Sequence, residues 1–267
     1  MGKPTTSKGR GAAPAPRASA KASRPAATKR APAKAPRPAA KGAPPEAAGV
    51  KGRPRTKVEQ RQESLEQILD AAEYLFSKRG LYGVTMRDVA ERVGIDPSLV
   101  TYYFSDKLNL FEAVGARRAS VTVGRRMRAL EEYEREAGAN PTAQGALHAF
   151  LDTDLDLYYE GGEGWMNYAA FGARVCNTPE GAELMDRQFD PVVLKLISIL
   201  KRALPHHSEE DIFWGYHFVT GALMNTLGRS GRIDRLSGGV CHSDDFPAIK
   251  KRMAEFMAGG FRAIKPK

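Results

Sequence analysis

Apolar side chains recur at helical spacing along most of this chain, and that periodicity restricts the fold more than any other feature. In the first apolar stretch, which predicts a helix over 58–79, the i, i+3, i+4, i+7 spacing is carried by Leu65, Ile68, Leu69, Ala72, Leu75 and Phe76. No segment has the alternation or the density of β-branched residues that is typical of strands. The sequence therefore predicts an all-α protein.

Capping residues predict where the next helices begin and end. Gly80 is expected to end the first helix as a left-handed C-terminal cap. A Thr-x-x-Asp capping box predicts that a second helix begins at Thr85, and Gly94 ends that helix. Asp96 can cap a third helix, with Pro97 in its first turn.

The rest of the chain continues as helices. Ser105 or Asp106 can cap a fourth helix, whose inward-facing residues are expected to be Leu108, Phe111 and Val114. The periodicity predicts helices over the ranges 107–135, 141–159, 165–176, 179–203, 208–229 and 245–264. The polar, Gly-rich stretch Arg229–Asp245 is predicted to be a loop between the last two.

Basic charge is concentrated at the N-terminus. The whole chain has a net charge of +10, but residues 1–57 hold 15 Lys and Arg residues against one acidic residue, Glu46. This segment also holds ten of the 17 prolines and no aromatic residue. Such a composition predicts a disordered tail that touches DNA phosphates without reading sequence. A solubilising tail or spacer is the alternative.

The end of this tail contains a Gly-Arg-Pro core within the sequence KGRPRTK, Lys51–Lys57. AT-hook peptides use a similar extended Arg-Pro segment in the narrow minor groove of A·T-rich DNA, where the negative potential attracts arginine. We therefore predict a minor-groove arm formed by Arg53, Pro54 and Arg55.

Several classes of protein are disfavoured by the sequence. The two cysteines, Cys176 and Cys241, support neither a disulfide framework nor a Cys/His metal cluster. No long apolar run or signal-like N-terminus occurs. Motifs of hydrolases, nucleotide-binding enzymes and metalloproteases are missing as well. The expectation is a cytoplasmic, nucleoid-associated protein that is not an enzyme and has no membrane partner, cofactor or metal.

The two short helices on either side of Gly94, Ile95 and Asp96 have the layout of a helix-turn-helix. In such a unit the first helix braces the second, whose N-terminal residues meet base edges in the major groove. Polar and aromatic residues on the second helix would then be left unburied because DNA covers them.

Residues 59–115 resemble the DNA-binding domain of the tetracycline-repressor (TetR) family. The resemblance is carried by ILDAAEYLFSKRGLYGVT, MRDVAERVGI and YYFSDKLNLFEAV, in that order. It implies a three-helix DNA-binding domain over 58–106, after the tail 1–57. It also implies that residues 107–267 form an all-helical domain for effector binding and dimerisation.

The resemblance further implies which residues contact double-stranded DNA. Phosphates would be bound by Thr85 and Lys107, and Arg87 would reach a base or a phosphate. The major groove would be faced by Pro97, Ser98, Thr101 and Tyr102, and the DNA backbone would be clamped by Tyr103. Thr101 departs from the family, which most often has Tyr there, and Tyr103 could instead pack on the first helix.

The C-terminal region is rich in aromatic residues, most of which are expected to form its core. Some could line a cavity between helices for a small, mainly apolar effector. The candidates are Tyr158, Trp165, Tyr168, Phe171 and Arg174, of which Arg174 could pair with a carboxylate or phosphate. A fainter resemblance to family members that sense fatty acyl compounds suggests an acyl-type effector.

These expectations combine into a homodimeric repressor that pairs its last two long helices and binds a palindromic operator. A small hydrophobic effector would tilt the fourth helix and release the DNA. An activator is not excluded by the sequence. The alternative function is a nucleoid-associated architectural protein driven by the AT-hook-like tail, and an enzyme would need a nucleophile–base pair that the sequence does not offer.

Overall fold

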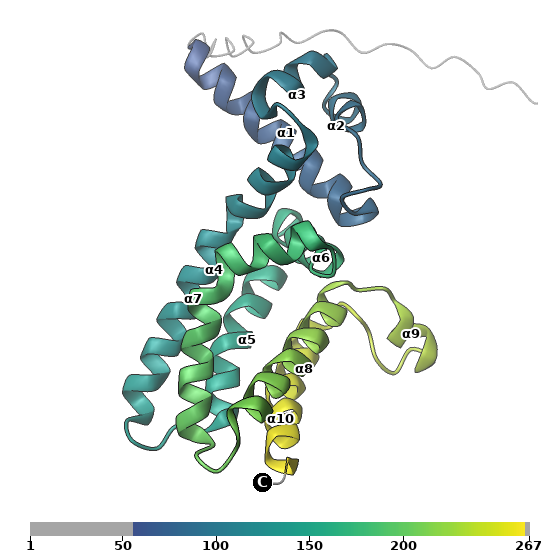
Figure 1. The fold of residues 1–267 in the computed structure, drawn as a ribbon. Coiled ribbons are helices and arrows are strands. Elements are labelled where there is room, and N and C mark those ends of the chain that lie inside the picture. The colour runs from purple at the N-terminus through teal and green to yellow at the C-terminus, as the bar shows by residue number, and fades with distance from the viewer. Residues whose placement is uncertain (1–55, 265–267) are drawn as a thin grey trace, which may run out of the picture. The chain divides into compact units, whose positions relative to one another are not determined.

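The computed structural model describes residues 56–264, and this range contains ten α-helices and no strand. The prediction of an all-α protein is confirmed. The tail residues 1–55, and with them the predicted arm of Arg53, Pro54 and Arg55, lie outside the described residues. The helices are α1 (Lys57–Arg79), α2 (Met86–Val93), α3 (Pro97–Phe104), α4 (Lys107–Ala137), α5 (Ala143–Glu160), α6 (Glu163–Val175), α7 (Pro179–Ala203), α8 (Glu209–Leu227), α9 (Arg232–Leu236) and α10 (Phe246–Ala263) (Figure 1).

Helices α2 and α3 begin at the side chains predicted to cap them, and α4 begins at one of its two candidates, whereas the cap of α1, Thr56, was not predicted. Thr85 caps α2 in a complete capping box with Asp88, and Asp96 caps α3 by accepting a hydrogen bond from the Ser98 amide. Of the two candidates for α4, Asp106 is the cap, because its carboxylate accepts from the Asn109 amide at 2.9 Å. Each such bond satisfies a donor that the helix itself leaves free.

Three local predictions were only partly right. Gly80 ends α1 as expected, and its amide donates to the Phe76 carbonyl, but its backbone angles (φ 70°, ψ 178°) are not those of the left-handed helical conformation. Leu108 is half exposed, because the buried face of α4 runs through Leu110, Phe111 and Val114 and leaves Leu108 at its edge. The stretch Arg229–Asp245 is not entirely a loop, since it contains the short helix α9.

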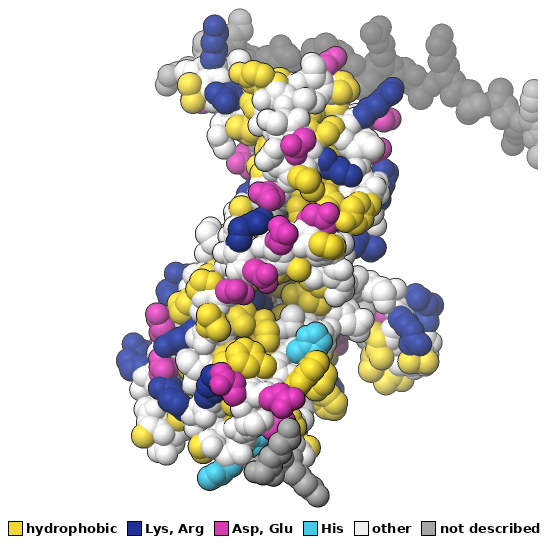
Figure 2. All heavy atoms as spheres, in the orientation of Figure 1, with side chains coloured by type: hydrophobic (Ala, Val, Ile, Leu, Met, Phe, Trp, Pro, Cys, Tyr) yellow, Lys and Arg dark blue, Asp and Glu magenta, His cyan; other side chains and the backbone are white. Residues whose placement is uncertain are grey.

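The segment around α9 lies to one side of α8 and α10 in Figure 1. It exposes apolar side chains at Ile233, Leu236 and Val240. Figure 2 shows basic and hydrophobic side chains together on this segment. The polar stretch is therefore mainly turns and irregular backbone, as predicted, and its one short helix buries no residue fully.

Helices α1 to α4 share an apolar core at the N-terminal end of the described chain. Phe76 of α1, Val89 of α2, Val100 of α3 and Phe111 of α4 are fully buried in it. The rings of Phe76 and Phe111 meet edge to face at 5.7 Å. Burial of each side chain of this size contributes about 1.5–3 kcal/mol, so this small unit is held together mainly by its apolar faces.

The same core continues among the remaining helices. α4 extends into it and packs against α5 and α7, α5 packs against α10, and α8 packs against α6, α7 and α10. Buried leucines dominate here, at Leu130, Leu147, Leu151, Leu155 and Leu196. Within residues 56–264, no helix is both long and apolar enough to cross a membrane.

The core is continuous between the N-terminal helices and the rest of the described chain through more than the length of α4. α6 packs along α1, and Phe171 of α6 inserts its ring beside Phe76 and Phe111, at centroid distances of 6.3 and 5.3 Å. A displacement of α6 would therefore change the packing of α1 directly.

Candidate nucleic-acid interface and effector hollow

The turn between α2 and α3 is fixed by one glycine and one cap. Gly94 ends α2 with left-handed backbone angles (φ 80°, ψ 34°), and its amide and that of Ile95 both donate to the Ala90 carbonyl. Glycine adopts this conformation without steric cost. Asp96 then starts α3, and its hydrogen bonds with Ser98 lower the pKa of its carboxyl below the ordinary value. The predicted helix-turn-helix geometry is present.

α3 is anchored by one side and open on the other. Val100 is its single fully buried residue, whereas Pro97, Ser98, Thr101 and Tyr102 are all exposed. Tyr102 retains 72% of its accessible surface. The four residues expected to face the major groove therefore lie together on one open surface, and no other part of the described chain covers it.

Two roles were considered for Tyr103, contact with the DNA backbone and packing on the first helix. It is half-buried against the core, and the guanidinium of Arg61 on α1 lies 5.8 Å from its ring centre. Its ring also meets that of Tyr102 at 5.4 Å. Packing on α1 thus holds Tyr103 at the margin of the open surface.

The residues predicted to contact phosphates differ in their exposure and in their hydrogen bonds within the protein. The Thr85 hydroxyl donates to Asp88 at 2.5 Å and also accepts from the Asp88 amide, so its capping role occupies it. These hydrogen bonds with Thr85 lower the pKa of the Asp88 carboxyl. Arg87 is exposed beside this cap, and Lys107 is half-buried in the first turn of α4.

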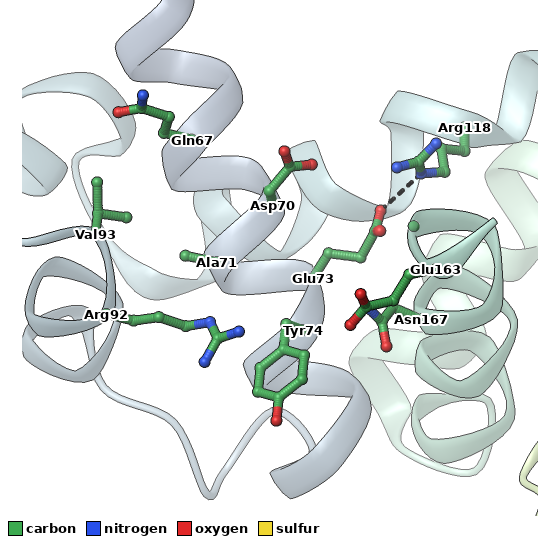
Figure 3. A pocket seen from close by; sticks show the side chains of 11 residues that line it. Gln67, Asp70, Ala71, Glu73, Tyr74, Arg92, Val93, Arg118, Glu163 and Asn167 are labelled. Atoms are coloured by element: carbon green, nitrogen blue, oxygen red, sulfur yellow. Dashed lines mark hydrogen bonds and ion pairs between the residues drawn. The ribbon is translucent and has the colours of Figure 1, made fainter. Parts of the chain in front are cut away.

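A polar hollow of about 750 Å³ lies where α1, α2, α4 and α6 meet (Figure 3). Glu73 of α1 is buried beside it and accepts from Arg118 Nε of α4 at 2.9 Å, with Arg117 Nη2 at 3.4 Å. Arg118 also lies over the ring of Trp165 on α6, at 4.8 Å from the centroid. Burial raises the pKa of Glu73, and the two arginines oppose that rise. One guanidinium thus connects α1, α4 and α6.

A second hollow, of about 610 Å³, lies between α6 and α8. Its size is within the usual range for small-molecule sites. Ala170, Ala173 and Met224 supply apolar lining. Its polar lining includes Arg174, Asn177, His217, Thr220 and Asn225. Sequence reasoning missed these residues apart from Arg174, because their shared cavity exists only once α6 and α8 face each other.

The five predicted effector-pocket residues are not gathered around one hollow. Tyr158, Tyr168 and Phe171 are buried in the packed core, and Trp165 packs partly against it. Tyr168 donates to the Gly115 carbonyl at 3.0 Å, which gives its hydroxyl a partner within the protein. Only Arg174 lines the hollow between α6 and α8. The aromatic residues thus mainly fill the interior.

A buried ion pair accounts for the position of Tyr158. Arg126 Nη2 lies 2.8 Å from Asp154 Oδ2, and Arg126 Nε donates to the Phe150 carbonyl. Tyr158 donates to the same Asp154 oxygen at 3.0 Å. Burial raises the pKa of the Tyr158 hydroxyl well above its ordinary value, and the Asp154 charge adds to that rise. This network joins α4 to α5.

The surface of α8 presents large aromatic residues. Phe213, Trp214 and Phe218 are 43%, 53% and 60% exposed, and the rings of Trp214 and Phe218 stack at 6.1 Å. On α10, Phe256 is 76% exposed. Exposed apolar residues of this size that gather on neighbouring helices mark interaction surfaces in soluble proteins.

An all-helical protein with an open, capped second helix in a helix-turn-helix belongs to the class of DNA-binding regulators. Family models agree with this class. The model of bacterial regulatory proteins of the tetR family matches residues 68–114, and that of the tetracyclin repressor-like C-terminal domain matches residues 148–260. The two matches together span more than half of the chain, which belongs to the TetR family of transcriptional regulators.

Individual relatives are distant. The HTH-type transcriptional regulator BetI of Escherichia coli O157:H7 is 22% identical over 173 residues, which cover 62% of this chain and 83% of BetI. TtgR of Pseudomonas putida is 40% identical over 60 residues, covering 22% of this chain and 28% of TtgR. Among solved structures, PfmR of Thermus thermophilus aligns with a TM-score of 0.49 and 17% identity, covering 78% and 95% of the two chains.

Proposed function

We propose that this regulator is a homodimeric repressor that places α3 of each subunit in the major groove of a palindromic operator. The observation that carries the proposal is the open surface of Pro97, Ser98, Thr101 and Tyr102 on a helix anchored by Val100. Polar and aromatic side chains held at fixed positions can read base edges, because each base pair presents a distinct pattern in the major groove.

Contacts to the DNA backbone would fix the register of α3. We assign these contacts to Arg87, Lys107 and Tyr103, with Thr85 holding the start of α2 in place. Phosphate contacts position a protein without reading sequence. A minor-groove role for Arg53, Pro54 and Arg55, and a phosphate-binding role for the basic tail, remain predictions from the sequence.

Dimerisation is proposed to use the exposed faces of α8 and α10. Phe213, Trp214, Phe218 and Phe256 support this assignment, because a surface of this kind can be buried against its own copy around a two-fold axis. The two copies of α3 would then meet successive major grooves about 34–36 Å apart, or a multiple of that distance.

The effector is proposed to bind in the hollow between α6 and α8. This site takes the place of the aromatic pocket expected from the sequence, and it keeps Arg174 from that set. Because α6 packs on α1, an effector that moves α6 can reorient the DNA-binding helices and α4. The effector needs different affinities for the two arrangements, and typical coupling is about 1–3 kcal/mol.

Footprinting and mobility-shift assays on the promoter region of this protein's own gene test the proposal. We expect one or a few protected sites, each with two-fold sequence symmetry, at physiological salt. Uniform coverage of A·T-rich DNA with no palindrome would favour an architectural protein instead. Titration between roughly 50 and 200 mM salt separates specific binding from the salt-sensitive contribution of phosphate contacts.

A further inference from the structure

Within residues 56–264, the lining of the hollow between α6 and α8 carries positive charge and no negative charge. Among the described residues that line it, Arg174 is the only one with a permanent charge, and none is a carboxylate. In the described part of the chain, Arg174 forms no ion pair, and its side chain is exposed. An unpaired guanidinium beside apolar and hydrogen-bonding side chains favours a ligand that joins an oxyanion to an apolar body, since guanidinium donors match carboxylate and phosphate geometry.

Arg174 has a second contact, on the DNA-binding side. Its Nε donates to the carbonyl of Ser77 at 2.9 Å, across 97 residues of sequence. Ser77 lies in the last turn of α1, where helix carbonyls have no amide partner within the helix. A cation at this end also interacts favourably with the helix dipole. Arg174 therefore caps α1 from outside.

We propose that Arg174 is a positioning residue that couples an oxyanion in the α6–α8 hollow to the DNA-binding helices. The oxyanion takes the Nε edge of the guanidinium, and the Ser77 carbonyl loses its donor. Hydrogen bonds in which both partners are ionised are stronger than those to a neutral carbonyl, so the exchange favours the ligand. This inference rests on the proposed repressor function and specifies both its ligand class and its route of regulation.

The route from Ser77 to the DNA surface is short. α1 ends at Arg79, and the chain then passes through the buried residues Leu81 and Val84 to the cap of α2 at Thr85. Arg79 itself lies 3.4 Å from Asp88 of α2. Loss of the external cap loosens the last turn of α1, and that turn leads directly into the helix-turn-helix.

Hydrogen exchange of residues 76–84 gives a readout that needs no DNA target. Full-length protein is measured alone and with dodecanoate, dodecyl phosphate or the neutral dodecanoate methyl ester. We expect each anionic probe to speed exchange in this segment and the ester to leave it unchanged. In Arg174→Gln the segment exchanges fast without any probe, and the anions add nothing. A response to dodecanoate alone identifies the oxyanion as a carboxylate, and a response to dodecyl phosphate alone identifies it as a phosphate.

DNA binding supplies the second readout. Arg174→Gln is expected to lower the affinity for the promoter site by at least about fivefold, the lower end of usual coupling. The matched control is Arg187→Gln, which removes the same charge from an exposed ion pair with Glu112. Melting temperatures establish that both variants are folded.

Three outcomes would overturn the proposed coupling between the ligand and the DNA-binding helices. In the first, residues 76–84 exchange at the same rate in Arg174→Gln as in wild type; in the second, the response to the anionic probes persists in that variant. In the third, wild type responds to no anionic probe at concentrations up to about 1 mM, which detect even weak binding. Wild-type protein that binds no promoter site rejects the repressor proposal instead, while the exchange experiment still decides the role of Arg174.

Discussion

At the scale of single residues, Tyr102 shows how a large side chain stays exposed on an anchored helix. Neighbouring Val100 is fully buried and holds α3 on its domain, so Tyr102 stays exposed without loosening the helix. An exposed aromatic residue on an otherwise anchored helix gains little from the folded protein itself. Its contribution is expected in the complex with DNA.

Substitution Tyr102→Ala should therefore weaken operator binding by about 1–3 kcal/mol for a lost base contact. The folded protein should keep its melting temperature, since the ring is 72% exposed. Fluorescence anisotropy with promoter and scrambled DNA measures the specific part. Tyr159→Ala removes another exposed tyrosine, on α5, and should leave DNA affinity unaltered; equal effects of the two variants would reject the role of Tyr102.

Glu73 makes a pH-dependent contribution whose sign follows from its burial. Burial raises its pKa above the ordinary 4.5, although Arg118 and Arg117 oppose the rise. As pH increases past 4.5, the unfolded chain loses this proton before the native protein does. The native state then holds more protons, so the free energy of unfolding falls with rising pH until Glu73 ionises in the native state as well.

Glu73→Gln removes this contribution. Urea unfolding of both proteins from about pH 4.5 to about pH 7 should show the stability of wild type, relative to the variant, declining across the window. Asp70→Asn serves as control, because Asp70 pairs with Arg117 but is exposed. A relative stability of wild type that instead grows with pH would mean that the arginine charges outweigh burial.

At the scale of elements, the α2–α3 turn depends on the left-handed backbone of Gly94. A Cβ added there would meet no atom within 4 Å, so the only cost of a side chain is conformational. Gly94→Ala should destabilise the protein by about 1–2 kcal/mol, the cost of left-handed backbone for an L-residue. Chemical unfolding measures it.

Gly172, in α6, is the matched control. An added Cβ there also meets nothing within 4 Å, but its backbone is helical. Gly172→Ala should stabilise the protein by up to about 1 kcal/mol through helix propensity. An equal loss of stability in both variants would reject the left-handed backbone of Gly94 as the cause.

At the scale of the whole molecule, the exposed rings of α8 and α10 must be covered for the proposed repressor to act. Phe218→Glu places a charge within that face and should give a folded monomer at concentrations where wild type is a dimer. Sedimentation equilibrium checks this, with Leu194→Glu at an exposed position of α7 as control. A dimer that survives Phe218→Glu would place the interface elsewhere.

Helices and caps could be predicted from the sequence because their causes are local. The Thr85–Asp88 box, the Asp96 cap and the Gly94 turn each involve residues within five positions of one another. The open face of α3 was also foreseen, since a family resemblance supplied its residues. Errors arose where local signals were ambiguous, as at Leu108, and in the loop that contains α9.

The candidate effector site could not be predicted from local sequence signals. Aromatic residues such as Phe171 and Tyr168 look alike in sequence whether they fill a core or line a cavity, and here they fill the core. The contacts of Arg174 with Ser77, and of Arg118 with Glu73 and Trp165, join residues far apart in the chain. The sequence by itself determined the helices, because helix formation depends on apolar periodicity and on caps, which act over a few residues. Which side chains meet was decided only by the tertiary packing of α6 between α1 and α8.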